Sequence, residues 1–339
     1  MVRLRELGNL YWSSCPDTEL IEALVRRGVA LVVDLTEGEC SYAVPPGVER
    51  LEYPIPDFSY TAFESVLVDV ALPVLERLKR GEKVLVHCRG GIGRSGVTVA
   101  MILGLRERIS RNDARQRLSR LGFVGETPSQ SLAFRWFFRA RDVIGVDLVA
   151  RLVNHLRRVK RGAFSYWSAY GVHASTVAGV ALDVLEAVAD RLGVSRGDLL
   201  NAYVAGLAHD VGRVLSVGGE HPSVGAEFAQ RLWESERAWD REIVSRAVYH
   251  HEDETDLLAD PSLRELGFNA QLVASAVRLA DMFENAYRGE GFYYGAELRG
   301  SEFVLLLSPE AWVLPLERLE RRAEAFTRLT GLEVRAETP

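Results

Sequence analysis

In the first third of the chain, short apolar runs alternate with segments whose apolar residues recur at helical spacing. Val29–Leu35 is almost continuously apolar, as expected for a strand buried on both faces of a parallel sheet. Asp17 can cap the helix that follows it, and Gly28 can end that helix. This order of elements predicts an α/β fold around a largely parallel sheet. The predicted strands are 10–12, 29–35, 48–53 and 83–86, and the predicted helices are 17–27, 62–80, 112–121 and 129–141, with a further buried helix starting at 97–103.

From Val143 onward the pattern changes to one helix after another, which predicts an all-α region. The tail differs again, because apolar runs at 302–307 and 332–335 flank a helical segment at 312–329. We therefore predict a multidomain protein with a small strand–helix–strand extension at its end, and a homodimer is one hypothesis for the role of that extension. The predicted boundaries are 1–142 for the α/β domain, 143–292 for the all-α domain and 293–339 for the extension.

Composition and charge favour some classes of protein and argue against others. The chain has 339 residues, of which 47% are hydrophobic and 26% charged, as in soluble globular proteins. A net charge of −6 argues against broad, charge-driven nucleic-acid binding. No apolar run reaches the roughly 18 residues of a membrane span, and the first residues lack a signal-peptide core. Three cysteines, one of them a catalytic candidate, favour a reducing compartment, so we expect a cytoplasmic protein without a membrane partner.

The segment His87–Gly96 carries the strongest chemical signal in the first domain. It reads His-Cys-Arg-Gly-Gly-Ile-Gly-Arg-Ser-Gly and connects a predicted buried strand to the start of a buried helix. A glycine-rich loop in this position collects backbone N–H groups that point at one spot, and the helix dipole adds positive potential there. The segment therefore predicts an anion-binding site.

The side chains of this loop suit phosphate chemistry. The helix N-terminus and a nearby guanidinium would lower the pKa of Cys88, which makes it a candidate thiolate nucleophile. Arg94 follows after five intervening residues, and its planar fork can bind two phosphoryl oxygens. Ser95 places a hydroxyl beside the sulfur, where it can stabilise the thiolate as a leaving group. His87 can fix the loop through hydrogen bonds.

A stiff loop upstream supplies a candidate acid. Pro54 and Pro56 could hold Asp57 near the phosphate pocket. Hydrolysis of a phosphate ester needs an acid to protonate the leaving oxygen and then a base to activate water. The alternative interpretation is an ordinary turn aspartate that follows a proline.

The sequence His-Cys, five residues, Arg-Ser-Gly resembles the signature loop of the protein tyrosine phosphatase superfamily, in its dual-specificity-like branch. The resemblance implies a thiophosphoryl intermediate on Cys88, Asp57 as general acid and Gln130 as the residue that positions the water; helix N-terminal chemistry is the alternative for Gln130. The loop lacks the added lysines of lipid-phosphatase relatives, and the RNA-triphosphatase asparagine is replaced by Gly93. A phosphorylated protein or a small phosphomonoester remains as substrate. The implied phosphate-binding residues are His87, Arg89, Gly90, Gly91, Ile92, Gly93 and Arg94.

Most of the seven histidines of the chain fall in the helical domain, five of them between His173 and His251. Imidazole nitrogens combined with carboxylates are the ligands that first-row transition metals prefer when they activate water. An adjacent His209-Asp210 pair can direct both groups to one metal, with the carboxylate bridging to a second. The candidate ligands are His173, His209, Asp210, His221, His250, His251 and Asp281.

Three segments of this domain resemble the HD-domain phosphohydrolase superfamily: 172–175, 206–213 and 279–281. The resemblance implies His173, His209, Asp210 and Asp281 as the basic metal set. His221 and His250 are similar to the added ligands of two-metal members, and His251 could take that role instead of His250 or donate a proton. The implied cofactor is one or two divalent ions of Mn, Fe, Co or Ni, and the expected substrate is a phosphomonoester or phosphodiester, with a nucleotide or an oligonucleotide end as the first candidate.

Three hypotheses for function follow. The first is a bifunctional phosphoesterase with a metal-independent cysteine site and a metal-dependent site. The second makes the helical domain a nucleotide-sensing, non-catalytic regulator of the phosphatase. The third is a scaffold with a phosphatase attached to it.

Overall fold

The computed structural model describes residues 3–123, 125, 127–216, 219–231, 237–283, 293–308 and 316–339. The chain forms two compact units, the first made of Met1–Asp142 and the second of Val143–Ala286 together with Glu290–Pro339. The predicted domain boundary at residue 292 and the predicted helix start at Trp312 fall outside the described residues.

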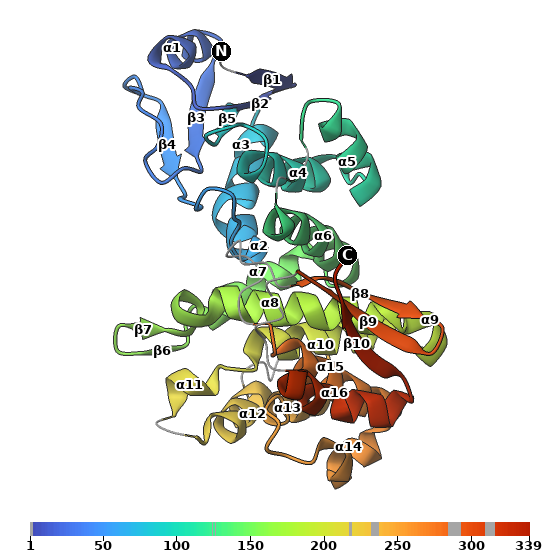
Figure 1. The fold of residues 1–339 in the computed structure, drawn as a ribbon. Helices are drawn as coiled ribbons and strands as arrows, with labels where there is room; N and C mark the ends of the chain where they lie inside the picture. Colours follow the sequence, from blue (N-terminus) through green and yellow to red (C-terminus); the bar gives the residue numbers. More distant parts are fainter. Residues whose placement is uncertain are drawn as a thin grey trace. The chain divides into compact units, whose positions relative to one another are not determined.

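A five-stranded sheet in the order β1-β2-β5-β3-β4 forms the centre of the first unit (Figure 1). The pairs β2–β5, β5–β3 and β3–β4 are parallel, which confirms the predicted, largely parallel α/β sheet. The edge strand β1, which pairs antiparallel with β2, was not predicted from the sequence. The strands are β1 (Leu4–Leu7), β2 (Leu10–Ser13), β3 (Val29–Asp34), β4 (Glu49–Glu52) and β5 (Lys83–His87).

Helices connect these strands and bury their apolar residues. Asp17 caps the first helix as predicted, because its side chain accepts a hydrogen bond from the backbone N–H of Leu20. The predicted long helix is a continuous run in which a π-helical turn separates two α-helical parts. The helix that follows the glycine-rich loop is buried on every side over its first three turns, so it runs through the core. The helices are α1 (Thr18–Arg26), α2 (Phe63–Val66), η1 (Leu67–Ala71), α3 (Leu72–Lys79), α4 (Arg94–Glu107), α5 (Arg111–Ser119) and α6 (Pro128–Val143).

Cys15 and Cys40 form a disulfide in the first unit, and Cys88 is the free cysteine. The sequence analysis did not predict this bond, because the two residues are 25 positions apart and no spacing motif joins them. Because two of the three cysteines form a disulfide, the number of cysteines no longer favours a reducing compartment. The cellular compartment therefore stays a prediction.

The second unit is built from helices around a central trio. The helix α8 packs against both α10 and α15, and these three carry long runs of buried Ala, Val and Leu. A short hairpin of β6 (Lys160–Arg161) and β7 (Phe164–Ser165) precedes α8. The helices are α7 (Val146–Leu156), α8 (Tyr166–Ala187), α9 (Ala189–Leu192), α10 (Arg196–Ala208), α11 (Gly212–Leu215), α12 (His221–Arg231), α13 (Arg241–Tyr249), η2 (Leu257–Ala259), α14 (Pro261–Leu266) and α15 (Phe268–Ala280).

The C-terminal segment adds a small sheet and one helix to this unit. The strands β9 (Glu302–Leu307) and β10 (Glu333–Glu337) are parallel, and helix α16 (Leu316–Thr330) lies between them in the sequence. The sequence analysis missed β8 (Tyr293–Arg299), which pairs antiparallel with β9. The strand β8 packs against α8, and α16 packs against α15. The segment therefore covers the helical core of its own unit.

None of the described helices combines the length and the apolar character that crossing a lipid bilayer requires.

Candidate functional sites

The loop after β5 wraps around the sulfur of Cys88. The backbone N–H of Gly91 points at Sγ over 3.3 Å, and the Ser95 hydroxyl lies 3.1 Å from it. The Cys88 side chain is buried, so both contacts act on the sulfur with little competition from water. Trp12 donates its indole N–H to the Ser95 oxygen at 2.8 Å. Because the Ser95 oxygen already accepts the hydrogen bond from Trp12, its own O–H is free to donate to the sulfur.

Gly91 is the residue that lets this loop lie close to the sheet. Its backbone has φ +66°, which favours glycine, and a Cβ there would overlap the backbone of Ser13 and Ser14. Arg5 donates to the Gly91 carbonyl at 2.8 Å and holds the loop from the other side. Gly91 therefore allows the close approach of this loop to the end of β2.

His87 lies beneath the loop as a buried, neutral anchor. Its Nε2 lies 2.7 Å from the Tyr42 hydroxyl and 3.7 Å from a carboxylate oxygen of Asp34. Burial lowers the pKa of His87 to about 4 and outweighs the opposing effect of Asp34. The imidazole is therefore uncharged at neutral pH and holds the end of β5 in place.

The structure brings Arg94 and Asp57 together. Arg94 is almost completely buried and donates to the Ile55 carbonyl at 2.7 Å and to an Asp57 carboxylate oxygen at 2.7 Å. Arg89 lies 3.6 Å from the other Asp57 oxygen. Asp57 thus lies at the glycine-rich loop, in contact with Arg94 and Arg89, and its role as an acid stays a prediction.

Glu39 is a second carboxylate at this loop, and the sequence analysis missed it. It accepts a hydrogen bond from Arg94 at 3.0 Å and lies 3.9 Å from Arg89. A solvated Glu-Gly-Glu stretch after a strand carries no motif, so the sequence held no signal for this contact. Gln130, on α6, is buried, and its amide lies 3.4 Å from the carbonyl of Ser59. That contact brings Gln130 to the loop that carries Asp57.

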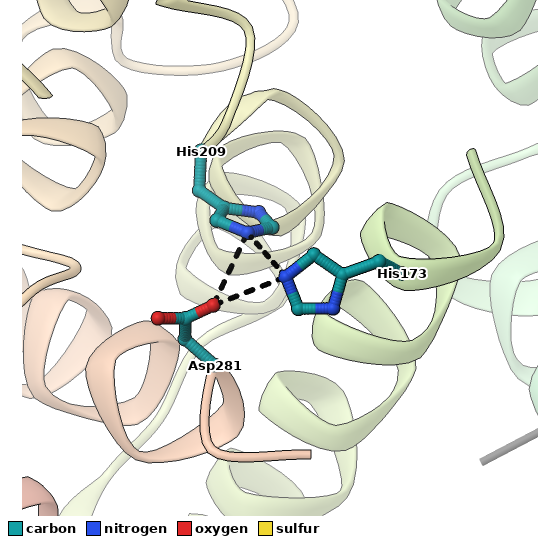
Figure 2. Close-up of side chains that lie close together, drawn as sticks. All are labelled: His173, His209 and Asp281. Carbon is teal, nitrogen blue, oxygen red and sulfur yellow. Dashed lines mark hydrogen bonds and ion pairs between the residues drawn. The ribbon is translucent and has the colours of Figure 1, made fainter. Parts of the chain in front are cut away.

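Three predicted ligands of the second unit meet at one point (Figure 2). His173 comes from α8, His209 follows α10 and Asp281 follows α15. The two Nε2 atoms are 3.0 Å apart, and one Asp281 oxygen lies 3.2 Å from His173 and 3.3 Å from His209. The central helix trio of the fold therefore supplies one ligand each.

A second group lies directly beside the first. His221 begins α12 and His251 follows α13, and their Nε2 atoms are 3.3 Å apart. One Asp210 oxygen lies 3.4 Å from His221 and 3.5 Å from His251. The other Asp210 oxygen faces the first group, 3.7 Å from His209. Asp210 thus offers one oxygen to each group.

Two protein-family models match the chain, one in each unit. A family model described as a Swiss Army Knife protein with a DSP-PTPase phosphatase domain matches residues 5–121. An HD-domain family model matches residues 170–286. The chain joins a DSP-type phosphatase domain to an HD domain. These findings indicate a hydrolase and support a phosphoesterase.

Individual relatives match only part of the chain. The protein "Putative tyrosine phosphatase 067L" of Invertebrate iridescent virus 3 is 35% identical over 102 residues. That match covers 28% of this chain and 42% of the viral protein, so the chain spans less than half of this relative. The solved structure of Tk-PTP in its active form is 30% identical, covers 40% of this chain and 97% of its own, and has a TM-score of 0.38. Human DUSP28 is 21% identical, with 41% and 94% coverage and a TM-score of 0.37.

In the HD domain, backbone contacts fix which ring nitrogen is free. Nδ1 of His209 lies 2.8 Å from the Gly206 carbonyl, and Nδ1 of His251 lies 2.6 Å from the Val248 carbonyl. A carbonyl only accepts, so Nδ1 of His209 and of His251 carries a proton, and Nε2 is the nitrogen that can bind a metal ion when the ring is neutral. Each of these Nε2 atoms faces a second imidazole Nε2 and a carboxylate oxygen, an arrangement that a cation would stabilise.

The spacing of these atoms fits a metal ion. Ligand atoms bound at about 2.1 Å with angles between octahedral and tetrahedral values lie roughly 3.0–3.4 Å apart. The group of His173, His209 and Asp281 spans 3.0–3.3 Å. Asp210 with His221 and His251 forms the second group of residues that could hold an ion. The HD domain thus carries residues for one or two divalent ions.

The structure does not bring His250 to either group. Its Nδ1 lies 2.7 Å from the Thr255 hydroxyl and its Nε2 lies 2.7 Å from an Asp260 oxygen. Both ring nitrogens are therefore engaged elsewhere, and the predicted ligand role of His250 is corrected in favour of its neighbour His251. His250 is the C-cap of α13, so the chain turns between the two residues and their rings point apart.

The two aspartates of these groups are held ionised. Burial raises the pKa of Asp210 and of Asp281, but nearby histidines outweigh it and hold both pKa values well below the usual range. Arg213 also donates to Asp210 at 2.5 Å and lies 3.2 Å from Glu252, which in turn lies 3.2 Å from Nε2 of His221. Glu252 is a neighbour of the second group that was not singled out from sequence as a ligand.

Proposed function

We propose that the chain is a bifunctional phosphoesterase, with a cysteine-dependent phosphatase site and a metal-dependent HD site. The observation that supports the first activity is the buried Cys88 sulfur between the Gly91 N–H and the Ser95 hydroxyl, in a loop that contains Arg94. The observation that supports the second is the pair of adjoining ligand groups that share Asp210.

At the phosphatase site, Sγ of Cys88 attacks the phosphorus and forms the S–P bond while the P–O bond to the leaving group breaks. Arg94 exchanges its contact with Asp57 for two phosphoryl oxygens, which leaves Asp57 free to protonate the departing oxygen. Water, positioned by Gln130 and deprotonated by Asp57, then releases phosphate and restores the thiolate. Ser95 stabilises that thiolate through its hydroxyl proton.

The substrate of this site is a phosphorylated protein or a small phosphomonoester. Among the loop residues between Cys88 and Arg94, Arg89 alone adds positive charge. Glu39 and Asp57 place two carboxylates at the same loop. A single phosphoryl group fits this charge balance, whereas a polyphosphate would meet like charge.

At the HD site, bound Mn, Fe, Co or Ni would polarise a phosphoryl oxygen and lower the pKa of a coordinated water. His173, His209 and Asp281 would hold one ion, and His221 and His251 a second. Asp210 supplies one oxygen to each group, so it sets their separation. Arg213 restrains that carboxylate and carries positive charge to the edge of the site, where it can bind a substrate phosphate. We expect a nucleotide or a phosphodiester as substrate.

The two activities can be tested in one set of variants. Cys88→Ser should abolish aryl phosphate hydrolysis in EDTA and leave metal-stimulated phosphodiester hydrolysis unchanged. Asp210→Ala should do the reverse, since it removes the carboxylate that both groups share. Aryl phosphate hydrolysis by Cys88→Ser in EDTA, at the wild-type rate, would contradict the cysteine mechanism.

Two adjacent histidines provide a matched pair for the metal site. His251→Gln should lower the metal content per chain, whereas His250→Gln should keep it, because His250 bonds to Thr255 and Asp260 instead. Equal metal loss in both variants would contradict the ligand assignment. Nucleotide binding without turnover, accompanied by a changed Cys88-dependent rate, would instead support an HD domain that acts as a sensor.

A further inference from the structure

We propose that Arg322, on the C-terminal helix α16, is a positioning residue of the HD metal site. The helix lies outside residues 170–286, to which the HD family model extends. It nevertheless reaches the ligands, because α16 packs against α15, the helix that ends at Asp281. This inference rests on the metal site of the proposed function and names a part of the chain that this site needs.

Arg322 contacts one ligand from each group. Its Nη1 donates to an Asp281 carboxylate oxygen at 2.9 Å and also to the backbone carbonyl of His251. Its Nη2 lies 3.5 Å from Asp253. The guanidinium is buried, so these bonds act where water competes little. One side chain thus ties the end of α15 to the turn after α13.

The two carboxylate oxygens of Asp281 have different partners. One oxygen faces both His173 and His209, and the other is bonded to Arg322. In Figure 2 the second oxygen points away from both imidazoles. The carboxylate is therefore oriented as a ligand through a single oxygen, and Arg322 fixes its rotation. Such outer contacts commonly change metal affinity by about 10- to 100-fold when they are removed.

A purely structural role would predict a different arrangement. Nε of Arg322 is buried and has no hydrogen-bond partner among the described residues. Leaving a buried donor unpaired costs stability, so packing alone does not account for a guanidinium at this position. Its paired nitrogens, in contrast, are directed at metal-site groups and at Asp253.

Arg321 provides the matched control. It precedes Arg322 on the same helix and also faces Asp253, at 3.5 Å, but its side chain is exposed and no contact joins it to a ligand. The experiment uses the full-length chain, stripped of metal, as wild type, Arg322→Met, Arg322→Lys and Arg321→Met. Mn²⁺ affinity and stoichiometry are measured by titration calorimetry. Thermal unfolding in EDTA and Cys88-dependent aryl phosphate hydrolysis report on folding.

We expect Arg322→Met to weaken the affinity of the Asp281-containing site for Mn²⁺ by at least about tenfold, with Arg321→Met unchanged. Arg322→Lys keeps the charge, but its shorter side chain lacks the planar fork of the guanidinium, so its affinity should fall between the two. If Arg322→Met unfolds, the lysine variant decides, because it should show weaker Mn²⁺ binding with unfolding like wild type. Equal affinity in all four folded proteins overturns the inference alone. A wild-type chain that binds no Mn²⁺ overturns the proposed metal site and the inference with it.

Discussion

Replacing Gly91 by alanine tests whether close approach of the loop creates the phosphatase site. The substitution adds one methyl group at φ +66°, and the new Cβ would lie 2.6 Å from the Ser13 carbonyl carbon and 2.7 Å from its oxygen. These are backbone atoms of a buried strand end, which cannot rotate away as a flexible side chain could. The loop must therefore move.

The expected cost follows from three effects. A left-handed backbone costs an L-residue about 1–2 kcal/mol, and overpacking adds about 1–3 kcal/mol. Alanine also lowers the conformational entropy of the unfolded chain, which offsets about 0.4–1 kcal/mol of this cost. The free energy of unfolding of the phosphatase domain should fall by about 3 kcal/mol. Moving the loop also breaks the bond from the Gly91 N–H to the sulfur, and a hydrogen bond to a charged group contributes about 1.5–3 kcal/mol.

The assay compares two neighbouring alanine variants. A Cβ on Gly90 would have no atom within 4 Å, and Gly90 has no positive φ, so Gly90→Ala should stay within about 1 kcal/mol of wild type. Urea denaturation gives stability, and hydrolysis of an aryl phosphate in EDTA gives kcat/KM of the cysteine site. In Gly91→Ala kcat/KM should fall by about ten- to a hundredfold, because each 1.36 kcal/mol of lost stabilisation is a factor of ten in rate. Equal stability and equal kcat/KM in the two variants would refute the reasoning.

Two further substitutions probe other parts of the chain. In Gly212→Ala a Cβ would overlap the backbone carbonyl of His221, which should push α12 away from the second group. The number of metal ions bound per chain should therefore fall, from two toward one. Elemental analysis of the purified variant checks this. Because His87 has a folded pKa near 4 and an unfolded pKa near 6.5, the stability that its neutral form contributes is complete above pH 6.5 and is lost as the pH falls toward 4. Unfolding free energy should therefore fall by about 2 kcal/mol more in wild type than in His87→Asn between pH 8 and pH 5, measured by urea denaturation, and parallel curves would argue against it.

The sequence predicted the local features of the fold well. Apolar runs located β3, β5 and β9, because each depends on residues that are neighbours in the chain. The glycine-rich loop predicted that a helix follows it, but α4 begins at Arg94, before the predicted start at Val97. The strands β1 and β8 were missed, since each has polar residues on its exposed face and becomes a strand by pairing with its neighbour.

Contacts between distant segments account for what the sequence could not predict at the sites. Nothing in the sequence places Glu39 beside Arg94, or Arg322 beside Asp281, because these pairs form only after helices and loops have packed. The choice between His250 and His251 depended on the turn that ends α13. The types and order of the residues therefore indicated the candidate catalytic and metal-binding groups. They did not indicate which other residues contact those groups.

The disulfide has a practical consequence for any study of the thiol in the same domain. The Cys15 N–H donates to the Arg89 carbonyl at 3.0 Å, and Cys40 follows Glu39, so the bridge joins two segments that both touch the phosphate-binding loop. Cys15 is more accessible to solvent than Cys88. A reductant added to protect the Cys88 thiol can therefore also open the bridge. Rates recorded with and without such a reagent then describe two covalent forms of one domain. Each preparation should therefore state whether the disulfide is intact.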